Sequence, residues 1–327
     1  MNHLVGPKRR GAASRGEWSA DLLADWRYPM GLKYPDGVLT PVDGAPSMSW
    51  PLVKLLRPRQ WLKNGFVLAP LVFSGMYLMP SAIAQALLAM ALFCLASSAT
   101  YILNDLKDVD KDRLHPKKKF SRPLAAGTVS VPQAKALLVG LYALITASLW
   151  LMPQVAGVII AYLAINVLYC YKLKHMPVVD LFCIGSGFVL RVFAGALAIS
   201  AVLSPWMFVT TLCLSLFLAT IKRYQELREG STGSRAVLEY YTLGLLERYG
   251  ALSAISAILF YGLFVATVRP ELAPTIPFIL FGMFRYWYIV ERLGGGESPT
   301  DALWGDKVLA LCVAAWVGVS MVTIALP

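Results

Sequence analysis

The sequence predicts an all-α integral membrane protein with nine membrane-spanning helices. The chain is 57% hydrophobic, and only 15% of it is charged, against ~25% in a typical soluble domain. Its mean hydropathy is +0.59. Nine apolar runs approach the ~20 residues that a spanning helix needs. The basic residues are concentrated in alternate connections between these runs, which is typical of a multi-pass membrane protein.

Residues 1–49 differ from the rest of the chain. They carry charges of both signs, Gly, Pro and Trp, and contain no long apolar run. This composition predicts a cytosolic N-terminal extension that is partly disordered or lies on the membrane surface. The segment 51–64 alternates apolar and basic residues, as an interfacial helix does. The membrane domain is therefore predicted to cover residues 50–327.

The nine apolar runs follow in order along the membrane domain. They cover residues 65–79, 82–103, 132–151, 155–171, 179–200, 204–221, 249–268, 274–290 and 307–326. The first run is short. Prolines stand at several of the breaks, which suits the ends of spans because proline cannot continue a helix.

The basic residues predict the orientation of the chain. If the N-terminus is cytoplasmic, 28 of the 30 Lys and Arg residues lie on the cytoplasmic side or at its edge. The exceptions are Arg191, inside a run, and Arg269, in an opposite-side connection. The positive-inside rule therefore predicts a cytoplasmic N-terminus and a C-terminus outside. Basic residues at loop edges, rather than along one face, argue against a nucleic-acid partner.

An acidic cluster follows forty uncharged residues, Gly65 to Asn104. Its spacing is N-D-x-x-D-x-x-x-D, formed by Asn104, Asp105, Asp108 and Asp112. If the second run continues as a helix, the three aspartates share one face and repel each other. A positive group is therefore expected between them. Hard oxygen ligands suit Mg²⁺, so we predict a magnesium site here; a solvated cytosolic loop is the alternative.

Basic side chains near the acidic cluster are candidates for binding phosphate groups. Lys119 and Arg122 follow the aspartates directly, and Lys222 and Arg223 end the sixth run, with Glu226 one turn later. Tyr171 and Lys172 lie at the end of the fourth run. Each of these groups also fits a simple anchor at the membrane surface.

Arg191 is the only charged residue between Asp180 and Lys222. A charged side chain inside a span costs at least ~2.5–3.5 kcal/mol and marks a candidate functional site. Its partner is expected to be Asp180, about three helical turns earlier, or an anionic substrate. The five cysteines show no Cys-x-x-Cys spacing and are interpreted as packing residues.

These features resemble the UbiA superfamily of intramembrane prenyltransferases. The acidic motif after the second helix and the Tyr and Lys residues after the fourth carry the resemblance. It implies a nine-helix bundle around a central cavity, with Mg²⁺ holding a pyrophosphate leaving group. Prenylating members carry a second D-x-x-x-D motif after the sixth helix. Here Lys222-Arg223-x-x-Glu226 takes its place.

One branch of the superfamily fits this departure. The segments "LRPRQWLKN", "NDLKDVDKDRLHPKKKFSRPLAAG", "GFVLRVFAGA" and "KRYQEL" resemble enzymes that transfer 5-phosphoribose from phosphoribosyl pyrophosphate to a decaprenyl-type phosphate. The resemblance implies a bacterial inner-membrane enzyme that makes cell-envelope polysaccharide precursors, with its active site facing the cytoplasm. The acceptor is already an anion, so no Ser, Cys or His nucleophile is needed. A second acidic motif would repel it, whereas Lys222 and Arg223 would attract it.

The resemblance also implies roles for individual residues. Asp105, Asp108 and Asp112, with Asn104, would hold Mg²⁺–pyrophosphate, and Lys119 and Arg122 would bind the ribose 5-phosphate. The pyrophosphate or the lipid phosphate would contact Tyr171, Lys172, Arg191, Lys222 and Arg223. Glu226 would orient these bases or contact the ribose, and Lys63 and Asn64 would approach the lipid phosphate at the interface.

Two other functions stay open at this stage. One is a prenyltransferase that uses a prenyl diphosphate and an aromatic acceptor. The other is a transporter of a phosphorylated lipid, although charges gathered on one side suit one-sided catalysis better than a path through the membrane. The sequence also leaves open whether the chain forms a homo-oligomer.

Overall fold

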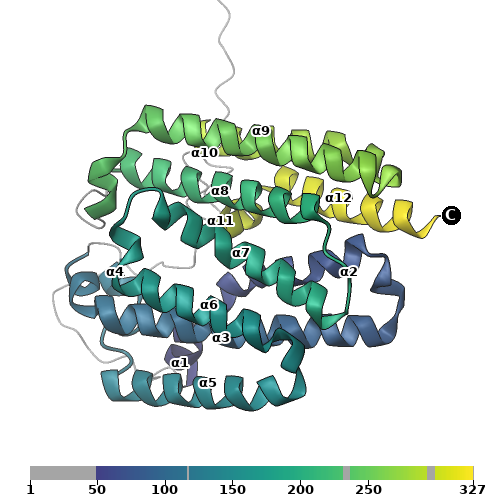
Figure 1. Cartoon of the computed structure of the whole chain (residues 1–327). Helices are drawn as coiled ribbons and strands as arrows, with labels where there is room; N and C mark the ends of the chain where they lie inside the picture. The colour runs from purple at the N-terminus through teal and green to yellow at the C-terminus, as the bar shows by residue number, and fades with distance from the viewer. Residues whose placement is uncertain (1–48, 116–117, 231–235, 293–298, 327) are drawn as a thin grey trace, which may run out of the picture. The chain divides into compact units, whose positions relative to one another are not determined.

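The computed structural model describes residues 49–115, 118–230, 236–292 and 299–326, all within the compact unit Pro46–Pro327. Residues 1–48 of the predicted extension lie outside the described residues. Within the described ranges every regular element is a helix, as Figure 1 shows. The prediction of an all-α fold is therefore confirmed.

The helices follow the apolar runs closely, with short helical pieces before and between them. The first part of the chain forms α1 (Ser49–Leu56), η2 (Pro58–Leu68), α2 (Ala69–Phe73) and η3 (Met76–Leu78). The long helices and their connecting pieces are α3 (Pro80–Leu114), α4 (Lys118–Ser121), α5 (Val131–Leu151), α6 (Pro153–Tyr171), η4 (Leu173–His175), α7 (Val179–Ala198), α8 (Pro205–Arg228), η6 (Ala236–Tyr240), α9 (Leu243–Thr267), η7 (Pro270–Thr275), α10 (Ile276–Arg292), α11 (Pro299–Gly305) and α12 (Lys307–Ala325).

Seven helices in the described part of the chain are long and apolar enough to cross a membrane: α3, α5, α6, α7, α8, α9 and α12. The prediction of one continuous helix over residues 65–79 is wrong. This stretch is split between η2, α2 and η3, because Gly75 adopts a left-handed conformation with φ 81° and Met79 is extended. The predicted eighth span begins in η7, which contains Pro274, and continues as α10, a helix of 17 residues.

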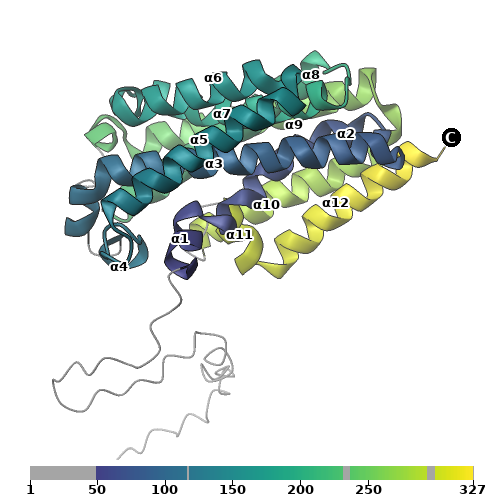
Figure 2. The ribbon, with the colours of Figure 1, turned by 90° about the horizontal axis from the view of Figure 1, so that it is seen from below.

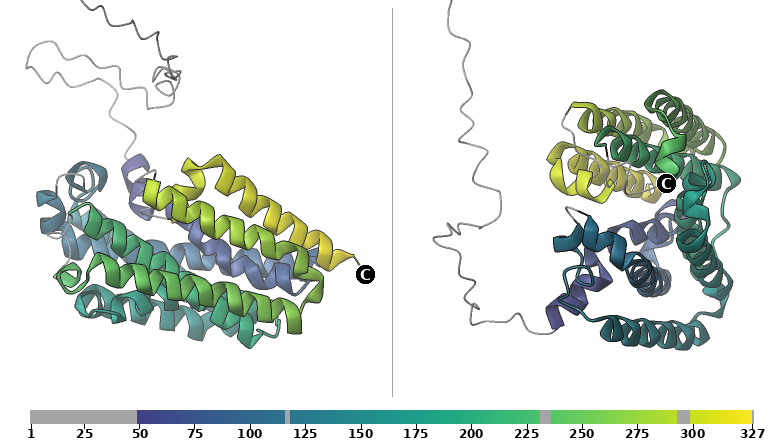
Figure 3. Two further views of the ribbon diagram at one scale, coloured as in Figure 1. Left: turned by 90° about the horizontal axis from the view of Figure 1, so that it is seen from above. Right: turned by 90° about the vertical axis from the view of Figure 1, so that its left-hand side faces the viewer.

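The buried apolar residues form two main clusters. The first gathers residues from η2, α2, α3, α5, α6 and the end of α7, and the second gathers residues from the start of α7 and from α8 to α12. Helix α7 belongs to both, with Ala194 and Ala198 in the first cluster and Leu181 in the second. The end-on view in Figure 3 shows these two groups of helices side by side.

The ends of several long helices meet at one end of the bundle. The carboxyl ends of α3, α6 and α8 and the start of α7 lie together on the left of Figure 1, near α4. The start of α3, the helix α2 and the C-terminus lie at the opposite end, and Figure 2 shows α12 running toward it beside α2. The polar segments 118–130 and 172–178 therefore share one end of the bundle.

Helix α7 and η2 pack with direct backbone contact at Gly195. A Cβ atom at this position would lie 1.9 Å from the carbonyl oxygen of Val67 and 2.9 Å from its carbonyl carbon. Real Cβ atoms do not come this close to backbone, so only glycine lets η2 lie against α7. This contact holds in place the segment that carries Lys63 and Asn64.

We expect Gly195→Ala to lower the melting temperature of the detergent-solubilised protein. The new methyl group must push η2 away from α7, and overpacking of this kind costs ~1–3 kcal/mol. The matched control is Gly157→Ala in α6, where a Cβ atom would meet nothing within 4 Å. Equal melting temperatures for the two variants would contradict the backbone contact.

Candidate active site

The acidic motif lies on the last turns of α3, which continues to Leu114. The expected helical spacing of Asp105, Asp108 and Asp112 is therefore confirmed. Asp105 and Asp112 are buried, with 2% and 4% of their surface exposed. Asp110 points to solvent, where it pairs with the exposed Arg113. The helix thus directs two of its carboxylates into the protein.

A positive group lies between two of the aspartates, as predicted. Nη1 of Arg122 donates to Oδ1 of Asp105 at 2.8 Å and also to Oδ2 of Asp112. The ammonium of Lys118 lies 3.7 Å from the other oxygen of Asp112. Both basic residues come from the segment that follows α3. This segment folds back onto the end of the helix, and its cations neutralise the aspartates there.

A second arginine reaches the motif from far away in the sequence. Arg57, which precedes η2 in a left-handed conformation with φ 55°, donates to Oδ1 of Asp105. Its guanidinium also lies over the ring of Tyr101, 4.9 Å from the centroid. Asp105 thus accepts from two arginines on one oxygen, while its other oxygen, Oδ2, is buried without a hydrogen-bond partner.

Asp108 contacts a different cation. Nζ of Lys174 in η4 donates to both carboxylate oxygens of Asp108, at 2.9 and 3.0 Å. Asn104 accepts a weak hydrogen bond from the thiol of Cys170 at 3.5 Å. The end of α6 and the start of the α6–α7 connection are thereby joined to the acidic end of α3.

The acidic side chains are suited to bind a divalent cation. Within the described ranges, no three His, Cys, Asp or Glu residues are grouped as a metal site. However, Asp105 and Asp112 converge on one cationic nitrogen, and Asp105 keeps one buried oxygen without a partner. A hard cation favours such oxygens and completes its shell with water and phosphate. Two carboxylates with a third nearby therefore fit Mg²⁺ bound together with a phosphorylated ligand.

Arg191 is buried among aromatic rings rather than beside a carboxylate. Its Nε donates to Oδ1 of Asn64 at 2.8 Å, and Nη1 donates to the carbonyl oxygen of Gly187 at 2.7 Å. The guanidinium also lies within 5.5 Å of the ring centroids of Phe93, Tyr162 and Phe188. Of the two partners predicted for Arg191, Asp180 or an anionic substrate, the first is wrong, because Asp180 pairs with Arg223 on the neighbouring helix.

The Lys222, Arg223 and Glu226 group contains one fully buried charge. Arg223 has no exposed surface, and its Nε donates to Asp180 at 2.7 Å. Its other two nitrogens donate to Glu226 at 2.6 Å and to the hydroxyl of Tyr169 at 3.0 Å. All three nitrogens of the guanidinium are thus already bonded to protein groups, and Lys222 beside it is only partly exposed.

The remaining predicted residues lie at the surface, except Lys63, which is partly buried. Lys119 is exposed and lies over the ring of Phe120, while Tyr171 is exposed under the ammonium of Lys107. Lys172 is also exposed. Lys63 is half-buried in η2. Its burial, and then the positive charge of Arg191, lower the pKa of Lys63 to about 8, while the negative charge of Asp301 acts in the opposite direction. None of these four contacts the aspartates through a hydrogen bond or ion pair in the described structure.

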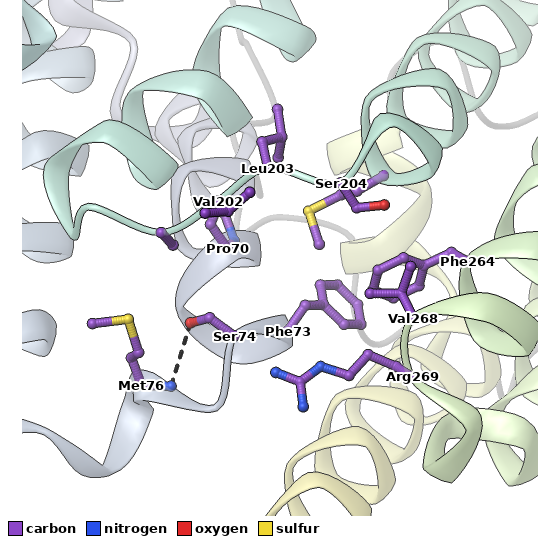
Figure 4. A pocket seen from close by; sticks show the side chains of 12 residues that line it. Pro70, Phe73, Ser74, Met76, Val202, Leu203, Ser204, Phe264, Val268 and Arg269 are labelled. Atoms are coloured by element: carbon purple, nitrogen blue, oxygen red, sulfur yellow. Dashed lines mark hydrogen bonds between the residues drawn. The ribbon is translucent and has the colours of Figure 1, made fainter.

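A separate apolar pocket of about 260 Å³ lies at the opposite end of the bundle (Figure 4). Pro70, Phe73, Val202 and Phe264 line it, and the guanidinium of Arg269 lies at its side. Arg269 forms an ion pair with Glu271 at 3.2 Å. Because this pocket contains no carboxylate and none of the predicted site residues, the acidic end of α3 is the better candidate for an active site.

Comparison with known proteins identifies the family. Residues 67–296 match the sequence profile of the UbiA prenyltransferase family. The chain belongs to the UbiA family. A UbiA homolog from Archaeoglobus fulgidus, bound to GPP and Mg²⁺, is similar in fold, with a TM-score of 0.66 at 20% identity. That similarity covers 84% of this chain and 100% of the homolog.

Two relatives are more similar in sequence. The decaprenyl-phosphate phosphoribosyltransferase of Mycolicibacterium smegmatis is 38% identical, over 82% of this chain and 90% of the relative. The protein of the same name from Mycobacterium tuberculosis H37Rv is 37% identical, over 81% of this chain and 91% of the relative. Within the UbiA family, the chain is therefore similar in sequence to phosphoribosyltransferases.

The site predicted from the sequence left out several residues that contact the acidic end of α3 or Arg223 in this UbiA chain. Arg57, Lys118 and Lys174 each approach an aspartate, and Asp180 and Tyr169 complete the contacts of Arg223. Lys174 lies only two residues after the predicted Lys172, so the α6–α7 segment did carry a signal. No local pattern distinguishes the two lysines, because the turn η4 decides which one points inward.

Proposed function

We propose that this chain is a Mg²⁺-dependent membrane phosphoribosyltransferase. It would move 5-phosphoribose from phosphoribosyl pyrophosphate to a decaprenyl-type polyprenyl phosphate and release pyrophosphate. One arrangement carries the proposal: two carboxylates of α3 converge on a single cationic nitrogen, surrounded by basic side chains from three other segments. Membership of the UbiA family and the names of the relatives support the assignment to transfer chemistry.

In this proposal the acidic residues bind the metal and the basic residues bind phosphate. Asp105 and Asp112, with Asp108 and Asn104, would hold Mg²⁺, which would neutralise charge on the leaving pyrophosphate. Arg57, Arg122, Lys118 and Lys174 now contact those carboxylates. With Mg²⁺ bound to the carboxylates, these basic residues would be free to bind the phosphates of the donor.

The acceptor supplies its own nucleophile. A phosphate oxygen of the lipid attacks the anomeric carbon of the ribose, and the bond from that carbon to pyrophosphate breaks. The chain therefore has to bind, orient and desolvate charged groups, which is an electrostatic task. Lys63, Asn64 and Arg191 are the proposed contacts of the lipid phosphate. Tyr171, Lys172, Lys119 and Lys222 remain proposed phosphate contacts nearer the surface, and Glu226 remains a proposed contact of the ribose.

The same proposal includes the path of the chain through the membrane. It crosses nine times from a cytoplasmic N-terminus, with residues 1–49 outside the membrane and the active site between the helices at the cytoplasmic face of a bacterial inner membrane. Helix α10, with 17 residues, is about 25 Å long and supplies one crossing beyond the seven longer helices. The broken segment 65–79 supplies the other. The product would serve the synthesis of envelope polysaccharides.

One assay tests the function directly. Purified full-length protein is incubated with Mg²⁺ and either labelled phosphoribosyl pyrophosphate with polyprenyl phosphate, or prenyl diphosphate with hydroxybenzoate. We expect labelled lipid and pyrophosphate from the first pair and no product from the second. Product from the second pair alone would instead support prenyl transfer. Movement of phosphorylated lipid across vesicles without pyrophosphate release would support a transporter.

A further inference from the structure

The connection between α6 and α7, residues 172–178, is held at both ends by one buried guanidinium. Arg223 on α8 donates to Asp180 in the first turn of α7 and to the hydroxyl of Tyr169 near the end of α6. Arg223 and Asp180 have no exposed surface. The two helices that flank the connection are thus joined through α8 by a pair of charges that are shielded from solvent.

Tyr241 adds a second contact at the α7 end. Its hydroxyl donates to Oδ1 of Asp180 at 2.7 Å and accepts from the backbone N–H of Val178, also at 2.7 Å. Burial, together with the hydrogen bond to Asp180, raises the pKa of Tyr241. The phenol therefore stays neutral and keeps the proton that it donates to Asp180.

Val178 adopts a backbone conformation that a β-branched residue rarely tolerates. Its φ and ψ are 67° and −46°. A conformation of this kind costs ~1–3 kcal/mol and persists only where the surrounding contacts impose it. The hydrogen bond from its N–H to Tyr241 is such a contact, so Tyr241 helps to determine how the connection enters α7.

The same connection carries Lys174, four residues before Val178. Lys174 reaches across to α3 and contacts both oxygens of Asp108. We propose that Tyr241, Asp180 and Arg223 are positioning residues that fix residues 172–178 and thereby hold Lys174 against the acidic end of α3. This inference rests on the proposed function, in which Asp108 helps to hold Mg²⁺ and Lys174 binds a phosphate of the donor. Arg223 then acts through Lys174 rather than by touching a substrate.

A double-mutant cycle tests the coupling. We expect Tyr241→Phe, which removes only the hydroxyl, to lower kcat/KM for phosphoribosyl pyrophosphate by about tenfold to a hundredfold through misplacement of Lys174. In the background of Lys174→Ala, the same change should have almost no further effect, because the group that it positions is gone. Tyr240→Phe is the matched control, since Tyr240 is 67% exposed. Additive effects in the cycle would overturn the inference.

A measurement without substrate separates this inference from the proposed function. Hydrogen–deuterium exchange of the full-length protein should be faster in residues 172–178 of Tyr241→Phe and unchanged in α5. Unchanged exchange in the connection would overturn the inference, whatever the activity. If the wild-type protein transfers no phosphoribose, the proposed function fails while this measurement still reports on the contact. Should Tyr241→Phe fail to fold, Tyr169→Phe removes the other hydroxyl, and the same two results are expected.

Discussion

Asp105→Asn is expected to lower phosphoribosyl transfer by at least ~100-fold, which is the order of loss when one preorganised electrostatic contact is removed. The substitution keeps the size of the side chain but removes its charge. Asp105 is the carboxylate with two arginine contacts and a buried oxygen that has no partner. Transfer of labelled phosphoribose at saturating Mg²⁺ measures the effect.

The protein should remain folded in this variant. Arg122 keeps its contact with Asp112, and Arg57, with a quarter of its side chain exposed, can turn toward water. Asp110→Asn is the matched control, because Asp110 is exposed and lies on the same turns of α3. The double variant Asp105→Ala, Asp108→Ala should be inactive and should lose any rise in melting temperature that Mg²⁺ and pyrophosphate give together. An active double variant would rule out the metal assignment.

Asp180→Ala is expected to destabilise the protein by about 3 kcal/mol, because it removes one partner of a buried ion pair. Arg223 would keep Glu226 but would lose the carboxylate on its Nε, at a position that the protein shields from solvent. The hydroxyl of Tyr241 would lose its acceptor at the same time. The melting temperature of the purified protein in detergent measures the change.

A second substitution distinguishes a lost ion pair from a simple cavity. Arg223→Met in the background of Asp180→Ala removes the buried charge that has lost its main partner, so part of the lost stability should return. Glu239→Ala, at an exposed position in η6, serves as the control and should melt like the wild-type protein. A double variant that melts below Asp180→Ala would show that the buried charge is not the cause of the destabilisation.

The parts of the fold that depend on local pattern could be predicted from the sequence. The apolar runs gave the long helices, and the continuation of the second run into the acidic motif placed Asp105 and Asp112 on one face. Repulsion between carboxylates predicted a cation between them, and Arg122 fills that position. In each case the residues concerned lie within about two dozen positions of one another, so spacing alone was informative.

The contacts that depend on distant segments could not be predicted. Arg57 reaches Asp105 only because η2 packs on α7 and α3, and Arg223 meets Asp180 only because α7 and α8 lie side by side. A single charged residue in an apolar run points equally to a lipid phosphate or to a protein partner. For this reason the hypothesis that joined Arg191 to Asp180 failed, since the choice was made by helix packing and by the amide of Asn64.

The length of α3 has a consequence for how a soluble donor and a lipid acceptor meet. The helix has 35 residues, and Asp105 lies 25 residues after its first residue, Pro80. At ~1.5 Å per residue this is about 37 Å along the axis, more than the ~30 Å of hydrocarbon in a bilayer. If α3 starts at the far boundary, its carboxylates stand in the headgroup layer. A sugar phosphate dissolved in water could then reach these carboxylates without entering the hydrocarbon, while its isoprenoid partner keeps its tail among the acyl chains.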